Sequence, residues 1–174
     1  TSYCNAVIDS QMTLREALGK VLSTARASLR MNGSQFSLVH DDVKGSIPVA
    51  VITPRNSWGF QAVRPFPEPV HAYRVQYVNK DAGYQKDERL VLADNYCYPY
   101  SIGGVTAIYD AWGTVCVPGS GGYILATKIE TIERWGITDP DMAFREGRYL
   151  LAVRALRQET YTVSQDFESI GYQV

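Results

Sequence analysis

The sequence predicts an α+β fold, and three observations support that class. Two segments, residues 14–29 and 140–156, carry apolar residues at helical spacing, and each is preceded by a residue suited to cap the start of a helix. Several shorter segments alternate between apolar and polar residues, as half-buried strands do. The order is helix, strands, loop, strand, helix, strand. We therefore expect one domain over residues 1–174, with two main helices packed on a mostly antiparallel sheet.

The first helix is predicted over residues 14–29. Thr13 and Glu16 have the spacing of a capping box, in which each side chain accepts a hydrogen bond from the other residue's backbone N–H. One face of this helix would be apolar, and Asn32-Gly33 would form the turn that follows it. The residues of that face are Leu14, Ala17, Leu18, Val21, Leu22, Ala25 and Leu29.

The second helix is predicted over residues 140–156. Asp139 suits the N-cap position, Pro140 the first helical position, and Asp141 adds negative charge to the first turn. Gly147 in its interior costs about 1 kcal/mol relative to alanine. Its presence predicts that a neighbouring backbone approaches the helix there.

Strands are expected where apolar residues alternate or run together. The segments 34–40 and 47–53 are expected to form a hairpin behind the first helix, with 47–53 as a continuous buried strand. Further strands are expected at 71–79, 88–94, 124–129 and 159–168.

Residues 95–122 differ from the rest of the chain because they carry much of its glycine and several aromatic residues. We interpret them as a peripheral excursion or insertion that contains one short hairpin. The aromatic residues are too many for a solvated linker. We expect them to be partly exposed in this chain and to pack, in an assembly, against a neighbouring subunit or another adjacent protein. The candidate interaction residues are Tyr98, Tyr100, Tyr109 and Trp112.

The stretch "ITPRNSWGF", residues 52–60, is interpreted as a joint where the chain leaves one sheet and crosses to the proline-rich segment 64–69. Pro54 fixes the backbone, and Arg55 has no local acid to pair with. Trp58 and Phe60 flank Gly59 and are expected to be largely buried. A ligand pocket that includes Arg55, Trp58 and Phe60 is the alternative.

The composition excludes several classes of function. The net charge is −1, without the basic excess of a nucleic-acid-binding protein, and the longest apolar stretches are far too short to span a bilayer. Three cysteines without a C-x-x-C pair form neither a disulfide framework nor a zinc site. We expect unpaired thiols, and a Cys97–Cys116 bridge in an oxidised protein is the alternative.

No pattern in the sequence indicates catalysis. His40 lies beside Asp41 and Asp42, but neighbouring residues on a strand point to opposite faces, so a solvated turn is favoured over a metal site. Glu130 and Glu133 would also point to opposite faces of a strand. The glycine-rich run at 118–122 lacks the lysine of a phosphate-binding loop. We expect no catalytic residue, no metal and no cofactor, and hence a protein that is not an enzyme.

Four segments together resemble a known family. They are "ITPRNSWGF", "HAYRVQYVNKDAGYQKDERLVLAD", "ATKIETIERWGITDPDMAFREGRYLLA" and "RQETYTVSQDFE". In this order they resemble the tail tip attachment proteins of lambda-like siphophages, the host specificity protein J family, and more broadly the central hub module of phage tail proteins. Residues 95–122 depart from that pattern, because a shorter connection is expected there.

The resemblance implies a structural role in a virion. It implies a homotrimeric hub that closes the distal end of the tail tube, contacts adjacent tail tip and tail tube proteins, and is made in the cytoplasm of the bacterial host. Receptor binding would belong to regions outside this chain, which would be a fragment of a much larger protein. No catalytic residue or cofactor carries over, and neither nucleic-acid binding nor membrane insertion is expected. The alternative is a carbohydrate-binding or cell-wall-degrading module of a phage tail, with Tyr and Trp rings of residues 95–122 stacking on sugars.

Overall fold

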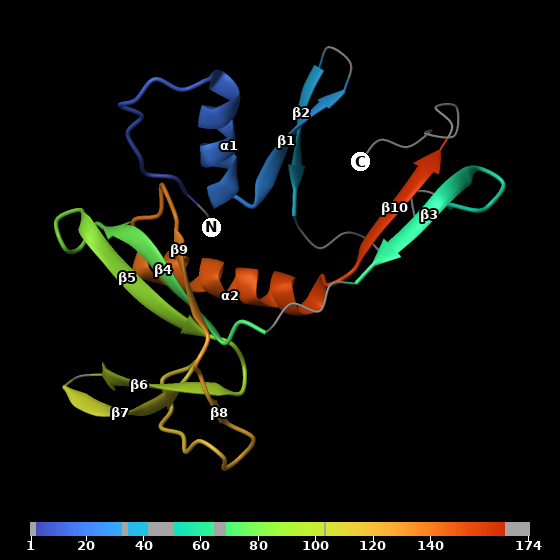
Figure 1. Cartoon of the computed structure of the whole chain (residues 1–174). Helices are drawn as coiled ribbons and strands as arrows, with labels where there is room; N and C mark the ends of the chain where they lie inside the picture. Colours follow the sequence, from blue (N-terminus) through green and yellow to red (C-terminus); the bar gives the residue numbers. More distant parts are fainter. Residues whose placement is uncertain (1–2, 33–34, 42–50, 65–68, 103, 166–174) are drawn as a thin grey trace.

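The computed structural model describes residues 3–32, 35–41, 51–64, 69–102 and 104–165. Within these ranges the chain forms two α-helices and ten β-strands in four small sheets (Figure 1). The helices are α1 (Leu14–Thr24) and α2 (Pro140–Leu156). The strands are β1 (Ala27–Asn32), β2 (Gln35–His40), β3 (Ser57–Val63), β4 (Ala72–Asn79), β5 (Gln85–Leu92), β6 (Tyr96–Ile102), β7 (Val105–Asp110), β8 (Ile124–Leu125), β9 (Ile129–Glu133) and β10 (Thr160–Gln165).

The main core lies between α2 and the sheet β5-β4-β9. Strand β4 pairs antiparallel with β5 and parallel with β9, so two distant parts of the chain meet on its edges. Alternate residues of β4 face α2, as the sequence predicted. The buried residues of this core are Val70, Tyr73, Val75, Tyr77, Val91, Ile137, Met142, Ala143 and Leu151.

Helix α2 has the predicted limits and the predicted cap. The Asp139 Oδ1 atom accepts hydrogen bonds from the backbone N–H groups of Asp141 (2.9 Å) and Met142 (3.3 Å). Gly147 faces the sheet at close range, since a Cβ atom there would lie 2.7 Å from Val91 Cγ2. The close approach predicted at Gly147 is therefore real, but side chains of the sheet make it rather than a backbone.

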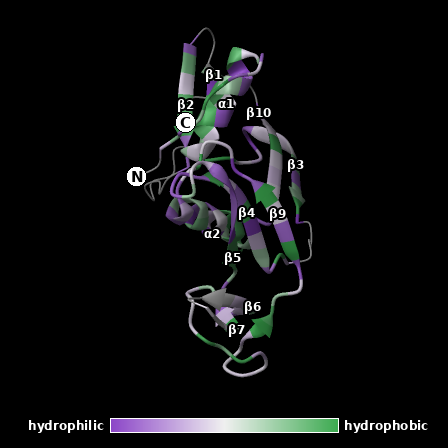
Figure 2. Ribbon diagram, turned by 90° about the vertical axis from the view of Figure 1, so that its left-hand side faces the viewer, coloured by the Kyte–Doolittle hydropathy of each residue, from purple (hydrophilic) through white to green (hydrophobic). Residues whose placement is uncertain are grey.

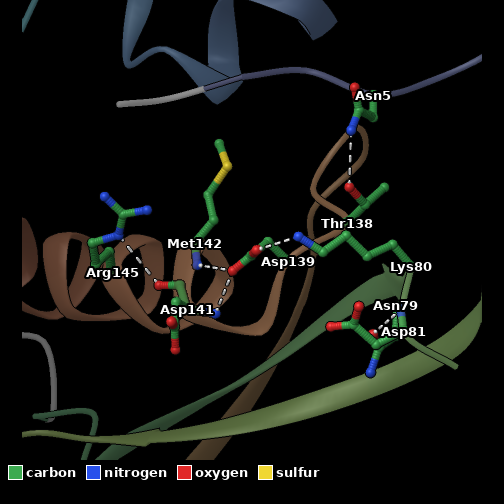
Figure 3. Close-up of polar contacts among 9 residues, drawn as sticks. All are labelled: Asn5, Asn79, Lys80, Asp81, Thr138, Asp139, Asp141, Met142 and Arg145. Carbon is green, nitrogen blue, oxygen red and sulfur yellow. Dashed lines mark hydrogen bonds and ion pairs between the residues drawn. The ribbon is translucent and has the colours of Figure 1, made fainter.

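The start of α2 is also joined to the rest of the molecule by polar contacts (Figure 3). The Lys80 ammonium donates to Asp139 Oδ2 at 2.7 Å, and the Lys80 N–H donates to the Thr138 carbonyl at 3.1 Å. On the other side, Asn5 Nδ2 donates to Thr138 Oγ1 at 3.2 Å. These bonds hold the β4–β5 turn and the N-terminal segment against the same end of the helix.

The excursion contains the predicted hairpin, formed by β6 and β7. This hairpin belongs to a separate three-stranded sheet of order β7-β6-β8. This sheet packs through Tyr96 and Tyr98 on a second cluster of buried residues, Ala72, Leu92 and Ala126. Figure 1 shows it on the opposite side of the core from β1, β2, β3 and β10.

The strand predicted over residues 124–129 is wrong, because the chain there forms two short strands in different sheets. His71 accounts for the interruption: its Nδ1 atom accepts from the N–H groups of Thr127 (3.1 Å) and Lys128 (3.2 Å). Those N–H groups therefore do not join a strand ladder, and β8 ends before β9 begins.

The predicted end of the first helix is also wrong. The capping box forms, with Thr13 and Glu16 bonded in both directions, but α1 ends at Thr24 and β1 begins at Ala27. Arg26, at φ 55°, turns the chain out of the helix, and its guanidinium contacts α2. The expected hairpin of 34–40 with 47–53 is replaced by β1 pairing with β2.

The buried strand predicted over 47–53 is contradicted at its described end, while residues 47–50 lie outside the described ranges. Val51 and Ile52 are exposed and in no strand, and a turn follows at 54–56. Asn56 builds that turn by accepting from the Thr53 N–H at 2.7 Å. The α+β class itself is confirmed, with antiparallel pairs in the majority.

Candidate functional site

Two strand pairs project from the core (Figures 1 and 2). Each presents apolar side chains to solvent. We call the pair β1 and β2 the first ribbon, and the pair β3 and β10 the second ribbon. Each is a two-stranded antiparallel sheet with no third strand among the described residues. Because two-stranded sheets are only marginally stable in water by themselves, both ribbons require a partner or a firm attachment to the core.

One face of the first ribbon carries two neighbouring apolar pairs. Leu29 lies opposite Leu38, and Met31 lies opposite Phe36, so that all four side chains share this face. Met31, Phe36 and Leu38 are exposed, with Phe36 at 68%. A contiguous apolar face of this kind marks an interaction surface on a soluble protein.

The second ribbon exposes aromatic rings. Trp58 is 56% exposed and Phe60 is 67% exposed, so the expectation that they are buried is wrong. Phe60 stacks on Tyr161 of β10, with ring centroids 6.0 Å apart, and both rings remain open to solvent. The physical reason is that β3 pairs only with β10 and no described element covers these side chains. Trp58 and Phe60 are therefore surface residues and not core residues.

Arg55 lies exposed in the turn before β3. The stretch 52–60 is therefore a turn followed by a strand, and it carries the chain into the second ribbon rather than out of a buried sheet. A cavity of about 820 Å³ lies elsewhere, between the N-terminal segment, the adjoining ends of β4 and β5, and residues 133–138. Arg55, Trp58 and Phe60 do not line it.

A cluster of polar side chains fastens the first ribbon to α2. Arg26, just before β1, bonds to Glu146 (Nε to Oε2, 3.2 Å) and its guanidinium lies 4.1 Å from the ring centroid of Tyr149. Asp41, just after β2, accepts from Arg157 Nη2 at 2.7 Å and from the Tyr149 hydroxyl. We call these five residues the α2 clamp, because they hold the base of the ribbon, where β1 begins and β2 ends.

The electrostatics of the clamp follow from these contacts. The hydrogen bond from Arg157, followed by that from Tyr149, lowers the pKa of Asp41 to about 2. The same bond to Asp41 raises the pKa of Tyr149. Glu146 is buried, and a second arginine, Arg134, lies 3.4 Å from its other carboxylate oxygen. The buried carboxylate thus has two cationic partners, as a buried charge requires.

The candidate residues of the excursion do not share one environment. Tyr98 and Tyr100 are half-buried and Tyr109 is buried, and the rings of Tyr100 and Tyr109 pack 5.0 Å apart. Trp112 is exposed, and it lies over the Arg148 guanidinium at 5.0 Å. Of the four residues, Trp112 therefore presents most of its ring to solvent, while Tyr109 belongs to the interior of its own sheet.

The groups weighed as catalytic candidates have structural partners. The Asp41 carboxylate belongs to the clamp. The other histidine of the chain, His71, has partners as well: its ring stacks on Tyr96 at 4.2 Å, and its Nδ1 accepts two N–H groups. Glu130 bonds to Arg154 at 2.8 Å, and Glu133 faces Lys86. Across the described ranges, no cluster of three or more His, Cys, Asp and Glu side chains is placed to hold a metal ion.

Sequence reasoning missed the apolar face of the first ribbon and the clamp. The apolar face had a signal in the sequence, because Leu29, Met31, Phe36 and Leu38 alternate with polar residues. That alternation is hidden because Leu29 also fits the apolar face of the predicted helix. The clamp had no signal in the sequence, because Asp41 and Arg157 are separated by 116 positions. Within the described ranges, neither helix is both long and apolar enough to cross a membrane.

Comparison with known proteins finds no family model that matches the chain, and no curated protein matches it.

Proposed function

We propose that the chain is a structural module of a phage or prophage tail tip, and that its two ribbons are the surfaces through which it assembles. In this proposal the full-length protein is a homotrimeric hub that closes the distal tail tube and carries host attachment through other regions. It contacts adjacent tail tip and tail tube proteins in the virion. The module itself is not an enzyme.

The observation that supports the proposal is the exposure of both ribbons. Their apolar residues, among them Phe36, Leu38, Trp58 and Phe60, are exposed. Those of the first ribbon share one face, whereas the pairing of β3 with β10 shifts register between Trp58 and Gln61. Burying such side chains contributes about 1.5–3 kcal/mol each. The folded chain leaves that free energy unused, so it is available for association with another subunit.

The two ribbons also differ from each other, which bears on the kind of assembly. The first is aliphatic with one phenylalanine, whereas the second carries Trp58, Phe60 and Tyr161. A closed ring requires each subunit to present two different surfaces to its two neighbours. The pair of unlike ribbons meets that requirement, and the resemblance in the sequence to tail hub proteins supports the same role.

Binding of carbohydrate is less well supported. In residues 95–122, Tyr100 and Tyr109 pack against each other, and the exposed ring of Trp112 lies over the Arg148 guanidinium. Three further exposed rings, Trp58, Phe60 and Tyr161, lie on the second ribbon and not on the excursion.

The test is to change each ribbon separately in the full-length protein. The double variants are Phe36→Ser with Leu38→Ser, and Trp58→Ser with Phe60→Ser. We expect each to weaken self-association by roughly tenfold or more, because two apolar side chains no longer become buried in the interface. Self-association is measured by analytical ultracentrifugation, and electron microscopy scores tails that lack a closed tip.

Leu156→Ser is the matched control, since Leu156 is exposed on α2 outside both ribbons. It should leave association and tail assembly unchanged. Normal trimers and intact tails in both double variants would show that the ribbons are not assembly surfaces, and the proposal would then lose its support.

A further inference from the structure

The small sheet β7-β6-β8 encloses two thiols that the proposed function does not use. Cys97 on β6 is 0% exposed, and Cys116, just beyond β7, is 7% exposed. The Cys97 thiol donates to the Ile124 carbonyl (3.4 Å), and the Cys116 thiol donates to the Ile108 carbonyl (3.7 Å). Neither is part of a disulfide in this structure.

The topology of the sheet places Cys97 and Cys116 at opposite edges of β7 but on one face of the sheet. Cys97 lies opposite Asp110 across the β6–β7 pair. On the other edge of β7, the Cys116 N–H donates to the Ile108 carbonyl at 3.0 Å, next to the bridge between Tyr109 and Val115. Ile108 and Asp110 are two positions apart on one strand, so they share a face.

The chain beyond Cys116 then folds back over this face. The Tyr123 hydroxyl donates to Asp110 Oδ2 at 3.1 Å, and the Ile124 N–H donates to the Asn95 carbonyl at 2.9 Å. The two thiols are buried beneath this return, and the Cys97 side chain is a close neighbour of Cys116. Burial, followed by the contact with Cys97, raises the pKa of Cys116 to about 11.

We propose that Cys97 and Cys116 are a modification site at which a small-molecule disulfide, such as oxidised glutathione, closes an intramolecular bridge. One cysteine thiolate attacks oxidised glutathione and displaces one glutathione thiolate. The second cysteine then attacks the mixed disulfide, forms the Cys97–Cys116 bond and displaces the other. Two protein thiols are oxidised, one glutathione disulfide is reduced, and two molecules of reduced glutathione carry away the two protons.

The same burial makes the reaction slow in the folded chain. A protonated and enclosed thiol is a poor nucleophile, so exchange must wait until the small sheet opens. In a chain that folds in a glutathione redox buffer, both thiols are accessible before the sheet closes. The bridge should therefore form much faster during refolding than after it.

Peptide mapping tests the proposal directly on the wild-type chain. The chain is refolded in a buffer of oxidised and reduced glutathione, and the remaining thiols are blocked with iodoacetamide in denaturant. No lysine or arginine lies between Cys97 and Cys116, so trypsin leaves both in the peptide 90–128, while Cys4 falls in 1–15. Chymotrypsin cleaves between them, after Tyr100, Tyr109 and Trp112.

We expect the tryptic peptide 90–128 to lose two hydrogens and to carry no iodoacetamide adduct. Chymotryptic peptides should be joined through Cys97 and Cys116, and Cys4 should remain alkylated. Glutathione adducts without that bridge, or a bridge that includes Cys4, would overturn the proposal.

The matched control is Cys4→Ser, since Cys4 is the third thiol of the chain. This variant should form the bridge as the wild type does, whereas Cys97→Ser and Cys116→Ser should not. A second measurement uses the wild-type chain alone: the oxidised form should melt about 5 °C or more above the reduced form, and dithiothreitol should abolish the difference. A bridge that lowers the melting temperature would show that the thiols are not positioned for bonding.

Discussion

Arg26 illustrates how a single residue divides one apolar pattern between two elements. Its φ of 55° lies in the left-handed region, which non-glycine residues seldom occupy. The guanidinium is bonded to Glu146 and stacked on Tyr149, and these contacts offset the backbone cost. The end of α1 is therefore determined by α2, which follows more than a hundred positions later in the chain.

Asp41 should give the clamp a measurable pH dependence. Its pKa in the folded chain is about 2, below the ordinary value of 3.8, so its contribution to stability is complete above pH 4. That contribution is lost as the pH falls through 2, when the carboxyl group becomes protonated. We expect the melting temperature of Asp41→Asn to fall less than that of the wild type between pH 5 and pH 2.

Thermal melts followed by circular dichroism at several pH values would measure this difference. Other carboxylates, such as Asp139 with its lowered pKa, titrate in the same range. The comparison between variant and wild type removes their effect, and parallel curves would mean that Asp41 does not contribute.

Gly147 should not tolerate a methyl group, although it lies inside a helix. Alanine gains about 1 kcal/mol in helix propensity. Its Cβ, however, would lie 2.7 Å from Val91 Cγ2 and 3.1 Å from Val75 Cγ2, and overpacking of a core costs about 1–3 kcal/mol. The difference between these terms predicts that Gly147→Ala lowers the free energy of unfolding in urea by up to about 2 kcal/mol.

Gly19 is the matched control, because it lies inside α1 and a Cβ there would meet no atom within 4 Å. Gly19→Ala should be neutral or stabilising by up to about 1 kcal/mol. If both substitutions stabilised the chain, the packing at Gly147 would be looser than the structure indicates.

At the scale of elements, the capping residues predicted where both helices begin, but residue spacing did not predict where α1 ends. Thr13 and Asp139 lie beside the backbone groups that they cap, and both helices begin where those residues predict. The end of α1 depended on tertiary contacts, and Leu29 fits both the helical stripe and the apolar face of β1. Residue spacing alone could not decide between the two.

The break between β8 and β9 has a similar cause. Ile124 to Ile129 alternate as a strand would, but the imidazole of His71 accepts two of the backbone N–H groups in between. His71 and Thr127 are 56 positions apart in the chain, so no local pattern could have revealed the hydrogen bond between them.

The ribbons were predictable in part. Strands β2, β3 and β10 lie in segments that the sequence identified as strand or joint, and the importance of Trp58 and Phe60 followed from their place beside Gly59. Their exposure did not follow, because alternation indicates that one face is apolar without indicating what covers it. That information belongs to the arrangement of the whole molecule.

For the whole molecule, the division into a core and an excursion leads to a prediction. Among the residues that the structure describes, none of the main core around α2 lies between 95 and 126. Deleting residues 99–119 and joining the ends through a short Gly-Ser linker should therefore leave a chain that unfolds cooperatively, with a lower melting temperature because Trp112 no longer covers Phe144.

Circular dichroism during heating would follow the unfolding of the shortened chain. Loss of the cooperative transition would show that the small sheet is part of the folding unit, and that the distinction between core and excursion does not hold. The full-length chain, melted under the same conditions, provides the reference temperature.

The parallel pairing of β4 with β9 also has a consequence for the time course of folding. β4 and β5 are neighbours in the chain and can form a hairpin within microseconds, whereas β9 and α2 emerge from the ribosome only after the entire small sheet. During that interval the far edge of β4 is an unpaired strand edge, and its apolar face has no helix to cover it. Synthesis of this protein therefore includes a period of seconds in which the nascent chain is prone to aggregation, and it ends when β9 adds to β4 and α2 closes over the sheet.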